Sequence, residues 1–446
     1  MVKKVLIVSP HFPPINAPDH QRVRMALTHL RNEGWEPVIL AVDPEASENS
    51  LDYSLLSTIP DDIEIHRVEA IPANLTRRVG LSSLALRCLP YLRQKGGELL
   101  SQGNFDLIFF STSLFPVMAC GPLWRKRYGV PYVLDFQDPW IPIEYEGQPA
   151  NPPGGKIKYA LSTVLARALE PSAIRNAAHL VVVSPAYPEQ LRERYPELNS
   201  TPITVLPFAA AESDLISART SDVDHGVFKR CDGLTHWVYA GIAGPMMHHS
   251  IRAFFRALES KVAEEPELRH RLRVHFIGTE YGGGDENHVG PLAREFNLED
   301  IVCEQTRRLP FLTTLKLLDD ADALLIFGSA DPSYTASKIF PYILAAKPLL
   351  VIAHKNSSTA DIVRRTRGGI VVDFDVHEEI AELSKRIYES WFAKKTLTVE
   401  TDWQAFEQYT ARSMTRKLSQ VFAAASESSS PVNSNSALVI SSSSVK

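Results

Sequence analysis

The sequence predicts an α/β protein with two doubly wound parallel sheets, and three observations predict this fold class. Short runs of β-branched and other apolar residues alternate with segments of helical periodicity along most of the chain. The chain has 446 residues, which exceeds one ordinary domain of about 100–200 residues. Hydrophobic residues make up 44% of the chain and charged residues 22%, a balance that can form sizeable buried cores.

The N-terminal half, 1–210, begins with the apolar run Val5–Val8, which has the pattern of a buried parallel strand. A proline-rich loop over 9–19 follows, and apolar residues then recur at helical spacing over 23–30. Strands that alternate with helices imply a mostly parallel sheet that is covered on both faces. Further strands are predicted at 37–42, 63–68, 107–110, 132–136, 180–183 and 203–207.

The polar stretch 211–233 has no clear periodicity and is predicted to be a linker. A second α/β series, 234–395, follows it, and the segment 396–424 is predicted to hold one amphipathic helix over 403–422. The Ser-rich segment 425–446 is expected to be a disordered tail. The strands predicted in the second series are 236–241, 274–278, 301–303, 323–327, 348–352 and 369–372.

Charge and cysteine content exclude several classes of function. The net charge of −5 gives no global basic field, so nucleic acid is not an expected partner. The four cysteines are scattered and no His pair has metal-ligand spacing, so we expect neither a disulfide framework nor a metal site. The apolar run Val5–Val8 is too short for a signal peptide, and no segment is long enough to span a bilayer. These observations favour a cytoplasmic protein.

Candidate ligand-binding residues of the second half follow its strands, where the crevice of an open parallel sheet lies. Gly241 and Gly244 follow the first of these strands and let the backbone approach a phosphate, although such glycines are also ordinary turn residues. After the fourth strand, Thr335 or Ser337 is a candidate helix cap beside Lys338, whose charge would face an anion. This pattern favours a diphosphate site, and the alternative is a solvated surface lysine.

The succession from Asp331 to Leu350 contains Ser337-Lys338 and ends in Ala346-Lys347-Pro348-Leu349-Leu350. It resembles the donor-site signature of retaining, family 4-like glycosyltransferases of the GT-B fold. The segments 9–14 and 34–38 resemble the opening of that family's N-terminal domain, and Asp135-Phe136-Gln137-Asp138-Pro139-Trp140 resembles a block of one of its branches. The likeness runs from Val2 to about Phe422.

The resemblance implies two Rossmann-like domains that face a cleft, with a C-terminal helix that crosses back. It also implies a retaining, metal-independent hexosyltransferase that needs no cofactor and uses a nucleotide-diphosphate sugar as co-substrate. The sugar would pass to a glycan or lipid-linked acceptor in the synthesis of a cell-surface polysaccharide or glycoconjugate. The donor-binding residues that follow from the loops and the resemblance are Gly241, Gly244, Glu280, Arg308, Ser337, Lys338 and Ile339.

Several positions depart from the family's pattern. Ser333 and Pro341 stand where the family has two acidic residues, and a proline cannot accept a hydrogen bond from a ribose hydroxyl. The usual Arg and Lys after the first strand of the second half are replaced, which leaves only His248 and His249 as weakly basic substitutes. The family's catalytic-loop His has no match at 111–113.

These departures keep a second interpretation open, a catalytically degenerate GT-B protein that binds a glycan or a partner. Sugar-nucleotide epimerisation is a third interpretation, but the chain lacks the cluster of acids and histidines that this chemistry needs in one cleft.

The N-terminal half is expected to bind the acceptor through His11, Asn16, His20 and Arg22. Arg22, together with Arg24, would neutralise a phosphate or carboxylate, or else cap and solvate a surface helix. Asp138 closes a strand that has a buried pattern, and an acid at the carboxyl end of a strand is a candidate for catalysis. We therefore predict Asp138 and Lys338 as the catalytic residues.

No acidic residue lies between Glu69 and Glu98, where basic residues alternate with leucines. Such a stretch, within 72–95, fits an anionic membrane surface, and it also fits an ordinary amphipathic helix with a solvated basic face. A lipid-linked acceptor would favour the membrane contact and would place the protein at the inner face of the plasma membrane.

Overall fold

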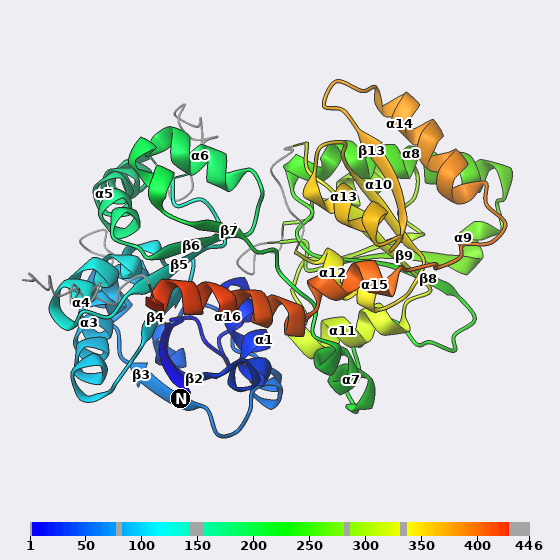
Figure 1. Ribbon diagram of the computed structural model, residues 1–446. Helices are drawn as coiled ribbons and strands as arrows, with labels where there is room; N and C mark the ends of the chain where they lie inside the picture. Colours follow the sequence, from blue (N-terminus) through cyan, green and yellow to red (C-terminus); the bar gives the residue numbers. More distant parts are fainter. Residues whose placement is uncertain (1, 77–82, 142–155, 281–285, 331–336, 428–446) are drawn as a thin grey trace, which may run out of the picture.

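The computed structural model describes residues 2–76, 83–141, 156–280, 286–330 and 337–427, which form two α/β domains with one parallel sheet each (Figure 1). The N-terminal sheet has the order β3-β2-β1-β4-β5-β6-β7 and the C-terminal sheet the order β10-β9-β8-β11-β12-β13. In the N-terminal sheet the strands are β1 (Lys3–Val8), β2 (Trp35–Val42), β3 (Glu64–Val68), β4 (Leu107–Ser111), β5 (Tyr132–Phe136), β6 (His179–Val182) and β7 (Ile203–Val205). In the C-terminal sheet they are β8 (Thr235–Ala240), β9 (Leu272–Ile277), β10 (Val302–Gln305), β11 (Ala323–Phe327), β12 (Leu349–His354) and β13 (Ile370–Phe374).

The helices cover both faces of each sheet, as the sequence predicts for parallel strands. Those that precede the domain boundary are α1 (Gln21–Leu30), α2 (Ala73–Thr76), α3 (Leu84–Gln102), α4 (Cys120–Tyr128), α5 (Lys156–Arg175) and α6 (Tyr187–Arg194). Those that follow it are α7 (Glu212–Thr220), α8 (His248–Glu264), α9 (Leu268–Arg271), α10 (Gly290–Glu295), α11 (Phe311–Asp320), α12 (Ile339–Leu344), α13 (Ser358–Arg365), α14 (Ile380–Ile387), α15 (Trp403–Phe406) and α16 (Ala411–Glu427).

The first strand shows why these strands are continuous apolar runs. Leu6 and Val8 lie in the core that β1 shares with α3 to α6, whereas Val5 and Ile7 lie in the opposite core with α1 and α16. Side chains alternate between the two faces of a strand. A strand that is covered on both faces therefore needs an apolar residue at every position.

The C-terminal helix crosses back from the second domain to the first, as the resemblance implies (Figure 1). Phe422 of α16 packs edge-on against Trp35 and Phe109, with ring centroids 5.3 and 4.9 Å apart. The single helix predicted over 403–422 is wrong in detail. It is two helices, α15 and α16, because the chain leaves helical geometry near Thr410.

The two crossings between the domains run side by side. The amide of Ala210 donates to the carbonyl of Tyr409 over 3.0 Å, and the amide of Ala411 donates to the carbonyl of Ala210 over 2.9 Å. The range 211–233, predicted to be a linker, contains α7, whose Leu215 and Ala218 are buried in the same core as Leu312 and Leu315 of α11. A helix of only nine residues with two buried apolar positions gives too weak a periodicity to be found in the sequence.

Within the described ranges, none of the helices combines the length and the apolarity that crossing a membrane requires. The helix α16 extends to Glu427, three residues into the segment predicted as the tail, and 428–446 lie outside the described residues.

Candidate active site

A network of buried polar side chains lies where β1 and β4 end, at the point where the strand order of the N-terminal sheet changes direction. Its centre is Asp19, which is 2% exposed. The carboxylate of Asp19 accepts hydrogen bonds from Thr112 Oγ1 (3.1 Å), from the Ser113 amide (2.9 Å) and from Ser113 Oγ (3.0 Å). These contacts fix the first loop of the domain against the loop that follows β4.

His11 is held by the same carboxylate. Its Nδ1 lies 3.1 Å from both carboxylate oxygens of Asp19. Burial raises the pKa of Asp19, but the hydrogen bond and charge of His11 and the amide of Ser113 outweigh it, and the pKa falls to about 2. Asp19 is therefore ionised at neutral pH, so Nδ1 of His11 donates the proton. The other ring nitrogen, Nε2, is then the atom that accepts a proton in the neutral imidazole.

Asp138 follows β5, the next strand of the sheet, and keeps an exposed side chain. Although solvent reaches the side chain, protein atoms around the carboxyl group partly desolvate it, and this desolvation together with the negative charge of Asp19 raises its pKa to about 6. Asp138 therefore changes charge close to neutral pH, as a residue that exchanges protons with a substrate must. Asn16, predicted to bind the acceptor, is half-buried in the first loop, and its backbone N–H donates to the carbonyl of Ser50.

Arg22 is fully buried and has a structural role, which contradicts the prediction that it contacts an acceptor. Its Nε donates to Asp135 over 2.8 Å, and its terminal nitrogens donate to the carbonyls of Leu206 (2.7 Å) and Pro207 (3.3 Å). Arg22 therefore ties α1 to the end of β5 and to the first crossing between the domains. A buried guanidinium needs such partners, because an unpaired charge in the protein interior is strongly unfavourable.

Arg24 and His20 are buried as well. Arg24 forms a bidentate ion pair with Asp214 of α7, with N–O distances of 2.8 and 2.6 Å. Both ring nitrogens of His20 are buried without a hydrogen-bond partner among the residues described. Burial and the charge of Arg24 lower the pKa of His20 to about 3, so this side chain stays neutral. Both side chains are buried, so the acceptor contact predicted for His20 has no support in their positions.

A second cluster lies at the carboxyl ends of the C-terminal strands, around Lys338. Its ammonium donates to Tyr239 Oη over 2.9 Å and lies 4.2 Å from the centroid of that ring. Burial lowers the pKa of Lys338 to about 7, and the nearby charge of Arg308 lowers it further in the same direction. Two cations therefore converge here, and an anion bound between them would restore the full charge of Lys338.

Two glycines let these cations come close to the backbone. A Cβ on Gly241 would lie 2.1 Å from Nζ of Lys338, and its φ of +141° is one that residues with side chains rarely adopt. A Cβ on Gly278, whose φ is +70°, would lie 3.2 Å from Cγ of Arg308. The glycine at 241 is thus favoured by its backbone conformation, and the absence of a side chain leaves the space that the Lys338 ammonium occupies, which the sequence could not show.

The other predicted donor residues take different positions. Gly244 precedes the short turn Pro245–Met247 that leads into α8, and Ser337 is exposed. The side chain of Ile339 is fully buried in the core beside Phe340, which leaves only the backbone of this residue for a donor contact, and that contact stays a prediction. The helix α12 begins at Ile339, one residue after Lys338, so an apolar core position falls directly beside the cation. Ser333 and Thr335 lie outside the described residues.

Glu280 pairs with His288, whose Nε2 lies 2.6 Å from its carboxylate. The ligand atoms of Glu280, Glu286 and His288 lie within 4.8 Å of one another. Exposed acidic groups often gather in this way without a metal ion, and among the residues described around Glu280, which exclude 281–285, nothing else points to one.

Loops that follow the strands of both sheets meet at the domain interface. Asp52, which follows β2, accepts a hydrogen bond of 2.6 Å from the amide of Phe311 at the start of α11, which follows β10. The guanidinium of Arg24 lies 4.7 Å from the centroid of the Phe311 ring. The carboxyl edges of the two sheets are thus brought toward each other, which is where a ligand shared by two such domains binds.

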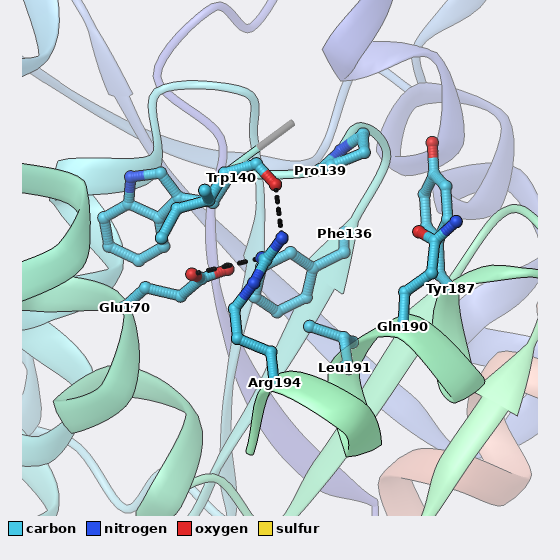
Figure 2. Close-up of a pocket in the computed structure, with 9 residues that line it drawn as sticks. Phe136, Pro139, Trp140, Glu170, Tyr187, Gln190, Leu191 and Arg194 are labelled. Atoms are coloured by element: carbon cyan, nitrogen blue, oxygen red, sulfur yellow. Dashed lines mark hydrogen bonds and ion pairs between the residues drawn. The ribbon is translucent and has the colours of Figure 1, made fainter. Parts of the chain in front are cut away.

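Beyond Asp138 the chain forms a small apolar cavity of about 10 Å³ between β5, α5 and α6 (Figure 2). Trp140 stacks on Phe115 with centroids 5.5 Å apart, and Arg194 lies between the carbonyl of Ile141 (2.9 Å) and the buried carboxylate of Glu170 (3.6 Å) (Figure 2). A space of this size is comparable to one water molecule and is too small for a sugar. Trp140 is therefore a core residue that supports Asp138.

Sequence reasoning missed Asp19, Ser113 and Tyr239. Asp19 carries a signal, because an acid in the loop after the first strand lies at the topological switch point. Ser113 and Tyr239 carry none, since a serine after a strand and a tyrosine within one are common in any α/β domain.

Comparisons with known proteins agree with this geometry. Residues 20–209 match the family model of the glycosyl transferase 4-like domain.

Three solved structures share the fold over nearly the whole chain. HepE from Anabaena, in complex with UDP and glucose, is 14% identical with a TM-score of 0.59, and 94% of this chain and 99% of that chain are covered. Sucrose-phosphate synthase from Thermosynechococcus elongatus is 14% identical with a TM-score of 0.58 and coverages of 94% and 98%. An α,α-trehalose-phosphate synthase (UDP-forming) from Burkholderia vietnamiensis is 11% identical with a TM-score of 0.60 and coverages of 96% and 100%. No curated protein sequence gives a significant match. The resemblance to family 4-like, GT-B glycosyltransferases is thereby confirmed.

Proposed function

We propose that this chain, which has the GT-B fold and a glycosyl transferase 4-like N-terminal domain, transfers a sugar from a nucleotide-diphosphate sugar to a glycan or lipid-linked acceptor. The reaction would belong to the synthesis of a cell-surface polysaccharide or glycoconjugate on the cytoplasmic side of the membrane. The observation that carries the proposal is the pairing of Lys338 with the glycine at 241 and with Arg308 at the carboxyl edge of the C-terminal sheet.

The donor's diphosphate would lie against these two cations. When the bond between the sugar and the diphosphate breaks, negative charge develops on the departing oxygen. Lys338 and Arg308 would stabilise that charge, and the Gly241 backbone leaves room for the phosphate to approach. The usual Arg and Lys after β8 are absent, so Lys338 and Arg308 would carry a larger share of the neutralisation than in the family pattern. We expect this stabilisation to need no metal ion.

The acceptor would lie against the N-terminal cluster. Nε2 of His11 is the proton-accepting atom of an imidazole that Asp19 holds in place, and Asp138 lies beside the same carboxylate with a raised pKa. Either group can bind the attacking hydroxyl, orient it and receive its proton. The resemblance implies that the anomeric configuration is retained. HepE, whose fold this chain shares, is described in complex with UDP and glucose, which supports a uridine nucleotide as the first donor to examine.

Calorimetric titration of the purified chain with UDP and with GDP tests the donor site, and a screen of their sugar conjugates with release of the nucleotide tests transfer. We expect one nucleotide to bind and its sugar conjugate to turn over in the presence of an acceptor. Nucleotide binding without turnover of any conjugate or acceptor would favour the second interpretation, a degenerate protein that binds a partner or glycan. Absence of binding by both nucleotides would refute the proposal, because the Lys338 cluster would then hold no diphosphate.

A further inference from the structure

Three helices, α3, α4 and α5, cover the same face of the N-terminal sheet. They lie along the side of that domain that is turned away from the C-terminal domain (Figure 1). Their outer surface, called here the α3–α5 face, takes no part in the site described above. Three leucines of α3, Leu84, Leu89 and Leu92, do not form this surface, because they pack toward the sheet.

The α3–α5 face is basic. The three helices contain ten Lys and Arg residues and two acidic residues, in a chain whose net charge is −5. One of the two acids, Glu170, and one of the ten basic residues, Arg87, are buried and do not belong to the surface. Exposed basic side chains on the face are Arg93 of α3 and Lys126 and Arg127 of α4. Positive charge is therefore concentrated on one side of a chain that is acidic as a whole.

The same face exposes large apolar side chains. Leu123 of α4 is 46% exposed, and Leu161 and Val164 of α5 are 51% and 66% exposed. On α5 the exposed residues Ala160, Val164 and Ala168 follow one another at intervals of four, so they form an apolar stripe along the helix. A contiguous group of exposed apolar side chains often marks an interaction site for a protein or a membrane. This stripe lies beside basic residues, so a partner of the face would have to match both features.

The apolar residues lie toward the edge of the sheet where the candidate acceptor site is. Leu123 lies in the first half of α4, which follows β4, and Leu161 and Val164 lie in the first half of α5, whose end leads into β6. In a parallel sheet each helix starts near the carboxyl edge and returns to the amino edge. The exposed apolar groups therefore neighbour the loops that hold His11 and Asp138.

A groove of about 490 Å³ between α3 and α4 adds a second observation. Arg93 and Arg127 line it from opposite helices, together with Gln94 and Tyr128. One carboxylate, Glu98, also lines the groove, and Lys95 pairs with it at 3.7 Å. The groove is open to solvent and has two guanidinium groups, which is the chemistry that binds a phosphate group.

We propose that the α3–α5 face docks on an anionic lipid bilayer, with Leu123, Leu161 and Val164 in the interface and Arg93, Lys126 and Arg127 against lipid phosphates. Exposed aliphatic side chains beside a surplus of cations suit a membrane surface. A nucleic acid would use the cations but not the aliphatic stripe. In this orientation the three helices lie along the bilayer and the carboxyl edge of the N-terminal sheet lies to one side of them, close to the lipid surface. The benefit for a lipid-linked acceptor rests on the proposed function.

Binding of the full chain to vesicles tests the proposal without any need for activity. Co-sedimentation is measured with vesicles of phosphatidylglycerol and phosphatidylcholine and with vesicles of phosphatidylcholine alone. We expect binding to the anionic vesicles that weakens as salt is added, and at least tenfold weaker binding to the neutral ones. Each basic residue near an anionic surface contributes about fivefold to the partition coefficient.

Two sets of variants locate the surface. Leu161→Asp with Val164→Asp, and separately Arg93→Glu with Lys126→Glu and Arg127→Glu, should each lower the partition coefficient at least tenfold. The matched controls are Ile216→Asp with Val376→Asp, which are 56% and 49% exposed elsewhere, and Arg256→Glu with Lys394→Glu and Lys395→Glu. All these positions are exposed, so circular dichroism should show the wild-type fold.

The proposal is overturned if the wild-type chain ignores anionic vesicles, or if both sets of variants bind as tightly as their controls. Light scattering of the wild type and of the Leu161→Asp, Val164→Asp variant tests whether a second copy of the chain binds to the face. A dimer that this variant dissociates would show that a second copy of the chain covers the face instead of lipid. A wild-type chain that binds a nucleotide but no anionic vesicles would refute the membrane inference and leave the proposed function standing.

Discussion

Replacement of Lys338 by methionine is the sharpest test of the donor site, because it separates function from stability. The ammonium donates to Tyr239 Oη over 2.9 Å and lies beside Arg308, and burial lowers its pKa to about 7. In the free protein, Met at this position removes a charge that is poorly solvated and that repels Arg308, so stability should be unchanged or higher. In the complex it removes a charged hydrogen bond to the diphosphate, worth about 1.5–3 kcal/mol. The dissociation constant for UDP should therefore rise about 10- to 150-fold.

The pH dependence gives the same test a second readout. Lys338 loses its proton as the pH rises through about 7, so binding of an anion should weaken above pH 7. Binding should also take up a proton, because the bound anion raises the pKa of the ammonium. Titration calorimetry in buffers of different ionisation enthalpy measures that uptake, and Lys338→Met should abolish it.

Lys347→Met is the matched control. Lys347 is another half-buried lysine whose pKa burial lowers, but it precedes β12 and so lies at the opposite edge of the sheet. This variant should bind UDP like the wild type. If Lys338→Met binds UDP with unchanged affinity, or if both lysine variants lose the same affinity, the reasoning that places the diphosphate at Lys338 is refuted.

Three further predictions follow from the same geometry. Gly241→Ala should weaken UDP binding at least tenfold in calorimetry, because its Cβ would displace the Lys338 ammonium, whereas Gly226→Ala, with φ +67° and no atom within 4 Å, should leave binding unchanged. Asp138→Asn should abolish the rise of the transfer rate through about pH 6. Because the pKa of Asp138 in the folded chain is above the unfolded value of 3.8, the wild type loses stability as the pH rises from 4 to 6. The melting temperature of the variant should therefore exceed that of the wild type above pH 6 and should not exceed it below pH 4. Equal melting temperatures at all pH values would contradict the raised pKa. Arg22→Met should lower the free energy of unfolding in urea by about 3–5 kcal/mol, since it leaves Asp135 buried without its cation, and Asp135→Asn in the same chain should recover part of the loss; a change below about 1 kcal/mol would show that the pair is not needed.

The interface between the domains explains why Arg22 and Arg24 could not be assigned from sequence. Both lie on α1 in the first loop region, where a free arginine would be a good ligand for a phosphate. Their partners are Asp135, at the end of β5, and Asp214, on a helix of the other domain. A sequence separation of 113 and 190 residues between partners hides such pairs from any local pattern.

The sequence by itself determined the two parallel sheets, their order along the chain and the loops in which chemistry is placed. It could do so because hydrophobic periodicity is local, and because parallel strands covered on both faces leave an unbroken apolar run such as Val5–Val8. It also predicted Lys338 and Arg308 as donor-binding residues, since both follow strands of one sheet and the carboxyl ends of such strands meet at one edge. The structure places the two side chains near enough for their charges to interact.

Only the tertiary structure decided which polar residues face a ligand. Arg22, His20 and Ile339 are buried, while His11 is oriented by Asp19. The space left by the missing side chain of Gly241 is filled by an ammonium 97 positions later in the chain. The physical reason is that burial and charge pairing depend on contacts between distant segments, and these contacts set both the accessibility and the pKa of each group. The same holds for the α3–α5 face. Leu84, Leu89 and Leu92 of α3 pack toward the sheet, whereas Leu123 of α4 and Leu161 and Val164 of α5 are exposed to solvent.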